Sequence, residues 1–476
     1  MFSRIRFKNL GLSLCFGILI GLSVLCLSNI AGNWLFLFTI GLFLFGFSLF
    51  IRIQQGSWLA PGAFFALYWA VFVILALVVA PDFDVRPEGL LWILFSIFAV
   101  YIGSVIGLGK MLFKAIPPSG QTRIKNLSTY RKPNNLNFPW LKQLVILCSI
   151  LGLGAIIVLV LSTGRDLLSL LSLESISQIG REYTIARYLD PAYKEPGLAV
   201  ALFTFIYLGA LFGGILFAKT SSKRDHIISL LPFIPAIGVM IILTTRTSIY
   251  FTILIWVSSY FSTHVLTSKG LPSLFRWKYI IPGLVILILL VGVVTMALMS
   301  RYGINIKNIN IEVLIKIWSM IRVDVFAPLA TFSQWFAQHW QETVEPAFGS
   351  FTFAGPLHWL GITEPLGYEP VEVPPTIFDT TLFTLFRNLI SDFTLIGSIL
   401  LLFAGGVLGG IVFRQVVRGE ILCLPILAAF YGVILCSFSG SLFDYTTVLI
   451  AWIIFVAYFV FIKIGKELKI NEDVLK

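Results

Sequence analysis

Several arginines lie beside the ends of long apolar runs: Arg181, Arg187, Arg246, Arg301, Arg322 and Arg387. A guanidinium is planar and always charged, and its fork of N–H donors matches two oxygens of a phosphate group. Arg246 is the sharpest case, because residues 243–248 leave almost no loop between two apolar runs. The run that follows would also aim its positive helix N-terminus at the same point. We expect at least two of these arginines to bind phosphate together; ion pairs or lipid headgroups are the alternative partners for each.

Carboxylates and histidines near the same positions could move a proton. Asp324 and Asp392 lie close to the ends of apolar runs and are candidates for a general base. Glu182 is a third candidate, and no specific spacing marks any of them. His339 and His358 could also act as a base, although each stands beside a tryptophan, a position typical of packed interfacial residues.

The sequence contains no motif for a metal or a nucleotide. The five cysteines lie in apolar runs without a C-x-x-C pair. There is no Walker loop, no G-x-G-x-x-G and no H-E-x-x-H. We therefore predict no metal site and no cofactor.

The elements that position these residues are membrane spans. The chain has 476 residues, 58% of them hydrophobic and 12% charged, which excludes a soluble protein. A bilayer core about 30 Å thick needs about 20 apolar residues per helix. Twelve runs qualify, so we predict an all-α polytopic membrane protein with spans near residues 10–28, 34–51, 58–80, 90–113, 143–162, 197–218, 226–243, 247–266, 279–300, 392–413, 421–439 and 446–463.

The distribution of charge predicts the orientation of these spans. If the N-terminus is cytoplasmic, the cytoplasmic segments hold 23 bases and 5 acids, and the outer segments hold 11 bases and 18 acids. This matches the excess of lysine and arginine that cytoplasmic loops carry, so we expect both termini in the cytoplasm of an inner (plasma) membrane protein. A thirteenth span over residues 311–340 would reverse the later segments and bury four charges. We expect that stretch to be a helix in the outer interface, broken near Pro328.

The loops divide the chain into four parts. Residues 1–162 hold the first five spans and a basic cytoplasmic linker at 110–142, and residues 163–300 hold the first outer loop and spans six to nine. Residues 301–391 form a large outer loop with interfacial helices, and residues 392–476 hold the last three spans and the tail. Because the basic charge is divided between two membrane faces, it does not indicate a nucleic-acid surface.

Several short motifs resemble those of a known family. Thr245-Arg246-Thr247-Ser248 opens a span, and the large outer loop ends in Thr380-Thr381-Leu382-Phe383-Thr384. Asp392-Phe393-Thr394-Leu395-Ile396-Gly397 follows, then a glycine-rich span over residues 405–410. From about residue 163 to 414 the chain resembles the Wzy-type oligosaccharide repeat-unit polymerases, which are related more distantly to O-antigen ligases. The family commonly shows Asp-Phe-Gly where this chain has Asp392-Phe393-Thr394.

The resemblance implies a metal-independent glycosyltransferase of surface polysaccharide biosynthesis. It would transfer a growing glycan from undecaprenyl pyrophosphate onto the next lipid-linked repeat unit, at the outer face of the membrane. A flippase and a chain-length regulator are the implied partners besides the bilayer. The expected catalytic residues are Arg246, Arg322, Asp324 and Asp392, with Arg181, Arg187, Arg301, Arg387, His339 and His358 binding pyrophosphate or glycan. An O-antigen ligase-like transferase and a lipid-oligosaccharide flippase remain the alternatives.

Overall fold

The computed structural model describes residues 33–109, 138–189, 193, 195–267, 292, 295, 310–342, 345–362, 368, 371–373 and 379–475. Within them the chain is almost entirely helical. The long helices are α2 (Asn33–Gln55), α3 (Pro61–Val79), α4 (Pro87–Leu108), α7 (Leu141–Ser162), α8 (Leu173–Leu189), α9 (Gly197–Lys219), α11 (Phe233–Leu243), α12 (Thr247–Thr267), α14 (Ile311–His339), α16 (Leu385–Val417), α17 (Cys423–Cys436) and α18 (Thr446–Leu475). Shorter elements are η1 (Leu167–Leu171), α10 (Lys223–Ser229), α15 (Ala354–Trp359), η4 (Leu442–Asp444) and the antiparallel pair β1 (Val371–Glu372) and β2 (Asp379–Thr380).

The described residues contain nine helical segments long and apolar enough to cross a membrane. They coincide with nine of the runs in the sequence, α10 and α11 together forming one of them. The run at 421–439 forms the shorter helix α17. The run at 10–28 lies outside the described residues, as does the run at 279–300 except for residues 292 and 295. The protein is therefore a multi-pass, all-α membrane protein, and the total of twelve spans stays a prediction.

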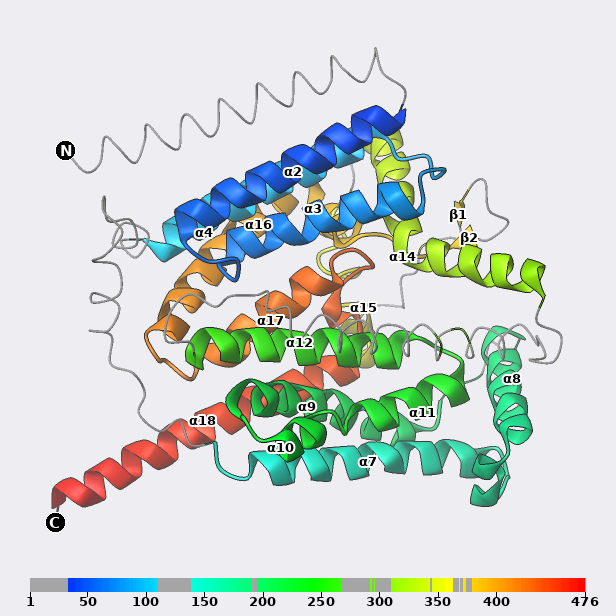
Figure 1. Ribbon diagram of the computed structural model, residues 1–476, viewed down its shortest axis with the longest axis vertical. Helices are drawn as coiled ribbons and strands as arrows, with labels where there is room; N and C mark the ends of the chain where they lie inside the picture. The colour runs from blue at the N-terminus through cyan, green and yellow to red at the C-terminus, as the bar shows by residue number, and fades with distance from the viewer. Residues whose placement is uncertain are drawn as a thin grey trace.

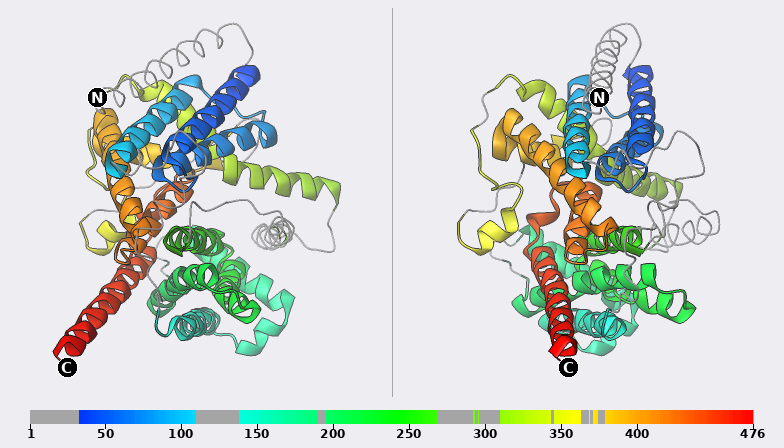
Figure 2. Two further views of the ribbon diagram at one scale, coloured as in Figure 1. Left: turned by 60° about the vertical axis from the view of Figure 1, so that its left-hand side comes forward. Right: turned by 90° about the vertical axis from the view of Figure 1, so that its left-hand side faces the viewer.

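The helices run side by side, and Figure 1 shows α8 and the β1–β2 pair at one end of the bundle and the last turns of α18 at the other. The start of α16 lies beside the connection between α17 and α18, because Leu385 N–H donates to the Ser437 carbonyl at 2.8 Å. The start of α12 lies beside the same connection, because the Tyr250 and Ser439 hydroxyls are 3.3 Å apart. We call the end of the bundle that carries these segments, α8 and the β1–β2 pair the loop end. The turned views in Figure 2 show the first half of α14 reaching away from the other helices.

The helix α14 differs from the expected break near Pro328, because it is continuous from Ile311 to His339. Proline removes one backbone donor and leaves the carbonyl four residues earlier without its helical partner. Figures 1 and 2 show that the axis of α14 changes direction between its two halves, while the helix itself continues through the buried residues Ala327 and Pro328.

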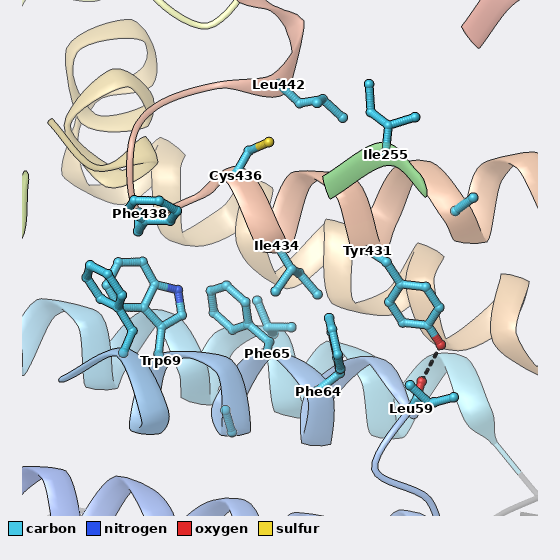
Figure 3. Packing of buried hydrophobic residues seen from close by; sticks show 14 of the residues in the cluster. Leu59, Phe64, Phe65, Trp69, Ile255, Tyr431, Ile434, Cys436, Phe438 and Leu442 are labelled. Carbon is cyan, nitrogen blue, oxygen red and sulfur yellow. Dashed lines mark hydrogen bonds between the residues drawn. The ribbon is translucent and has the colours of Figure 1, made fainter. Parts of the chain in front are cut away.

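A dense apolar core joins α3, α12 and α17. Figure 3 shows Phe64, Phe65 and Trp69 of α3 facing Tyr431 and Ile434 of α17. The fully buried Tyr431 hydroxyl donates to the Leu59 carbonyl at 2.5 Å, just before α3 begins. That bond satisfies two polar groups where no water reaches, which removes the cost of burying them.

Glycines bring α4 and α16 into backbone contact. A Cβ added at Gly103 would lie 2.1 Å from the Phe403 carbonyl oxygen, and one added at Gly107 would lie 2.1 Å from the Val407 carbonyl oxygen. On the facing helix, a Cβ at Gly406 would lie 2.3 Å from the Val100 carbonyl oxygen. Small residues spaced by four let membrane helices approach this closely. The glycine-rich stretch of α16 thus has a packing role.

Gly107→Ala should separate this helix pair and lower the free energy of unfolding by about 1–3 kcal/mol, the usual cost of overpacking. Thermal unfolding in detergent measures the change. Gly405→Ala is the matched control, because no atom lies within 4 Å of its added Cβ. Equal melting temperatures for Gly107→Ala and Gly405→Ala would contradict the close packing of α4 and α16.

Candidate functional site

The helix α16 is interrupted near its start, and the interruption shapes the loop end. Thr394 has φ 66° and ψ 176°, a conformation that glycine adopts readily and other residues rarely do. The helical hydrogen bonds stop there, so carbonyl groups just before it need other donors. The Ser391 and Asp392 carbonyls accept from the Ala347 and Phe348 N–H groups, each at 3.1 Å.

The Asp392 side chain fastens the same loop. It is fully buried, and its Oδ1 accepts from the Phe351 N–H at 3.0 Å. Its Oδ2 accepts from the Thr352 N–H at 2.7 Å and from the Thr352 hydroxyl at 2.5 Å. A carboxylate with both oxygens bonded in this way holds a loop in place. Asp392 is therefore a positioning residue in this arrangement.

A second set of bonds seats the loop on the first turns of α16. The Tyr368 hydroxyl donates to Asn388 Oδ1 at 3.0 Å, and Asn388 Nδ2 donates to the Phe351 carbonyl at 3.3 Å. The Phe351 and Tyr368 rings stack at 4.9 Å with 6° between their planes. Residues 351 and 368 are thus brought together over one face of α16.

Arg387 lies next to this stack, inside an aromatic cage formed by Trp335, Tyr368 and Phe383. Its guanidinium carbon is 3.7 Å from the Phe383 ring centre, 3.8 Å from that of Tyr368 and 5.0 Å from that of Trp335. Among the described residues no carboxylate forms an ion pair with Arg387, and its buried Nε has no hydrogen-bond partner. Each cation–π contact contributes about 0.5–2 kcal/mol. The cage holds the arginine without neutralising it, which suits an anion site.

The structure brings Arg246 and Asp324 together. Arg246, just before α12, donates from Nη2 to Asp324 Oδ1 on α14 at 2.6 Å, and its Nη1 pairs with Oδ2. About a quarter of each side chain is exposed. The sequence analysis named both residues, and this fork-like pair is the ion-pair alternative that it left open for Arg246.

Arg246 and Arg387 contact α14 at separate places. Asp324 and Trp335 are eleven residues apart on that helix, on either side of Pro328. Asp324 neutralises Arg246, whereas no carboxylate among the described residues forms an ion pair with Arg387.

The remaining arginines are distributed around the same end. Arg322 on α14 pairs with Asp82 and lies 5.1 Å from the Phe83 ring centre. Arg187 pairs with Glu195, while Arg181 is exposed on α8. Arg301 lies outside the described residues. The assignment of these arginines to phosphate binding stays a prediction.

The two histidines lie on different helices. His339 ends α14, where its Nδ1 is 2.8 Å from the Trp335 carbonyl oxygen and its ring stacks on the Trp335 ring at 5.5 Å. His358 is exposed on α15. In the part of the chain that the structure describes, no group of three or more His, Cys, Asp or Glu could hold a metal ion.

Asp444 is a carboxylate at this end that the sequence analysis missed. It ends η4 between α17 and α18, where the sequence Ser439-Gly440-Ser441 leaves almost no loop between two apolar runs. The same signal that marked Arg246 could have found it. Burial and the neighbouring Asp392 carboxylate raise the pKa of Asp444 to about 8, against a lowering by the Ser441 amide.

Two tyrosines, Tyr368 and Tyr445, lie within electrostatic range of charged groups at the loop end. Burial raises the pKa of Tyr368, Arg387 and Ser391 lower it, and Asp392 and Asp444 raise it further. Burial likewise raises the pKa of Tyr445, as does Asp444, while Thr247 and Arg187 lower it. Both tyrosines therefore lie within electrostatic range of Asp444, one toward Arg387 and the other toward the start of α12.

No family model, curated protein or solved structure matches this chain. The argument for a function therefore rests on the residues and their geometry.

Thr394→Gly should relieve the backbone strain at the interruption of α16 and raise the free energy of unfolding by about 1–3 kcal/mol. Thermal unfolding in detergent measures it. Leu400→Gly, an exposed position in the regular part of the same helix, is the control and should lose about 1 kcal/mol. A loss of stability in Thr394→Gly equal to that of the control would mean that no strain is stored there.

Proposed function

We propose that the protein is an oligosaccharide repeat-unit polymerase that transfers a growing glycan from undecaprenyl pyrophosphate onto the next lipid-linked repeat unit. The main support is Arg387, which has no carboxylate ion-pair partner among the described residues and lies at the loop end against Tyr368, a side chain within electrostatic range of Asp392 and Asp444. Transfer from a phosphate ester requires a cation that stabilises the leaving phosphate, and an arginine held by aromatic rings without a carboxylate partner can serve as that cation.

The interruption of α16 supports the same reading. The resemblance places glycine where this chain has Thr394, and the backbone there adopts a positive φ of 66°. Glycine is the residue that tolerates this conformation best. The motif thus corresponds to a physical feature, a break in α16 directly after Asp392.

The reaction replaces one carbon–oxygen bond by another and removes one proton from the acceptor. A hydroxyl of the acceptor sugar loses its proton, and its oxygen attacks the anomeric carbon of the donor glycan. The bond from that carbon to the pyrophosphate oxygen breaks, and undecaprenyl pyrophosphate leaves with the electron pair. Positive groups fixed near the leaving oxygens stabilise the charge that develops on them.

The described residues divide these tasks. Arg387, held by its aromatic cage, contacts the pyrophosphate of the donor. Arg246 is neutralised by its ion pair with Asp324, and the pair holds the start of α12 against α14. Asp392 holds the loop over α16 and thereby keeps Tyr368 against Arg387.

The loop end would face away from the cytoplasm, in an inner membrane with both termini cytoplasmic. The charge partition along the sequence supports this orientation, because the opposite end of α16 carries Arg414 and Arg418. Lipid-linked repeat units would then be polymerised at the outer face.

Cysteine labelling tests the orientation. In a variant whose native cysteines are replaced by serine, Glu345→Cys should react with a membrane-impermeant maleimide added outside, and Glu420→Cys should react only after the membrane is opened. Both positions are exposed and undergo the same substitution, so each is the control for the other. The reverse pattern would invert the bundle and remove the site from the outer face.

Substitution of Arg387 tests the phosphate contact. Arg387→Ala should lower the rate of polymer formation from purified lipid-linked repeat units by about 10²–10³-fold, the usual loss for one transition-state donor. Arg387→Lys should also be impaired, because it keeps the charge but loses the planar fork.

Arg165→Lys is the matched control, since Arg165 is an arginine of the same end that pairs with Glu182 at 2.5 Å. It should polymerise at the wild-type rate. A well-expressed Arg387→Ala protein with wild-type activity would show that Arg387 only packs against its aromatic cage.

A further inference from the structure

Asp444 differs from the neighbouring Asp392 in its hydrogen bonding. Its Oδ1 is buried and has no hydrogen-bond partner among the described residues, whereas Asp392 accepts three bonds on its two oxygens. An unsatisfied buried carboxylate oxygen lowers the stability of the fold, so its presence points to a functional role for Asp444. The contrast gives two adjacent carboxylates two roles, one fastened and one with a lone pair to offer.

The backbone around Asp444 is fixed closely. A Cβ added at Gly355 of α15 would lie 2.0 Å from the Asp444 carbonyl oxygen, so α15 packs directly on η4. The Ser441 side chain accepts from the Phe443 N–H at 3.1 Å, which holds the 3-10 turn. Gly440, at φ 127°, packs beside the carboxylate, since a Cβ there would lie 3.6 Å from Asp444 Oδ2. Asp444 is thus placed by rigid contacts on both sides.

We propose that Asp444 is the general base that takes the proton from the attacking hydroxyl of the acceptor sugar. The inference rests on the proposed function and adds the residue that the sequence did not identify. The first ground is the Asp444 carboxylate, whose buried Oδ1 has no hydrogen-bond partner among the described residues, and the second is the fixed turn that holds it. The third is Tyr368, whose ring face contacts Arg387 and which lies within electrostatic range of Asp444.

The proton balance is simple. The acceptor O–H bond breaks as the oxygen bonds to the anomeric carbon, and the proton moves to the Asp444 carboxylate. The carbon–oxygen bond to the pyrophosphate breaks in the same step. Asp444 then releases its proton to water, and the carboxylate is restored for the next transfer.

The charge state of Asp444 depends on every titratable group that faces it. The Asp392 carboxylate on α16 disfavours the ionised form of Asp444. Within electrostatic range of Asp444 lie Tyr368, Tyr445 and, at the end of α17, Cys436. From α15 the contact is the backbone at Gly355. With its pKa raised to about 8, Asp444 is mostly protonated at pH 7 and becomes a competent base as the pH rises through that value.

The test measures the rate of polymer formation between pH 6 and 9, using purified protein and lipid-linked repeat units. The wild-type rate should rise about tenfold from pH 7 to pH 9, following ionisation of a group with a pKa of about 8. Asp444→Asn should lose the rise and at least about 10²-fold in rate at pH 8, as expected for removal of a general base. Asp444→Glu keeps a carboxylate and should retain a rise with a shifted midpoint.

The outcomes separate the two levels of the proposal. A folded Asp444→Asn protein with the wild-type rate and pH profile overturns the assignment of the base and leaves the polymerase intact. If that variant does not fold, the wild-type profile decides, because a flat rate from pH 6 to 9 also overturns the assignment. A wild-type protein that forms no polymer at any pH overturns the proposed function and the base with it.

Discussion

The loop end depends on one buried carboxylate. Asp392 accepts bonds from Phe351 and Thr352 at the point where α16 is interrupted, and the two carbonyls freed by the interruption accept from residues 347 and 348. A loop over membrane helices has many polar backbone groups and few apolar contacts, so its position must come from hydrogen bonds of this kind. Tyr368, Arg387 and the contact of α15 with Asp444 all follow from that placement.

The groups that could do chemistry come from segments far apart in the chain. Arg387 is on α16, while its aromatic cage comes from α14, β2's following loop and the segment at Tyr368. Asp444 comes from the connection between α17 and α18. Helices position most of these side chains, and Phe351 and Tyr368 stack beside Arg387. The charged side chains at this end differ in burial: Arg246 is paired and partly exposed, whereas Asp392 is fully buried.

The sequence predicted the helices well because a bilayer imposes a simple rule on length and composition, which α3 and α9 follow from end to end. It was less informative about the loop end. Arg246 and Asp324 were recognised singly, but their pairing spans 78 positions and depends on how α12 and α14 cross. The cage around Arg387 combines three segments, and the continuity of α14 through Pro328 depends on burial that periodicity does not report. Asp444 could have been found from its short connection, whereas its unpartnered oxygen is visible only in three dimensions.

The contact between α4 and α16 has a consequence for how lipids approach. At Gly103, Gly107 and Gly406 the two helices touch through backbone atoms, which leaves no gap wide enough for an acyl chain. Lipid therefore cannot enter the bundle between α4 and α16 along this contact. Under the proposed function, a polyprenyl tail that reaches the loop end from the bilayer would pass between other helices.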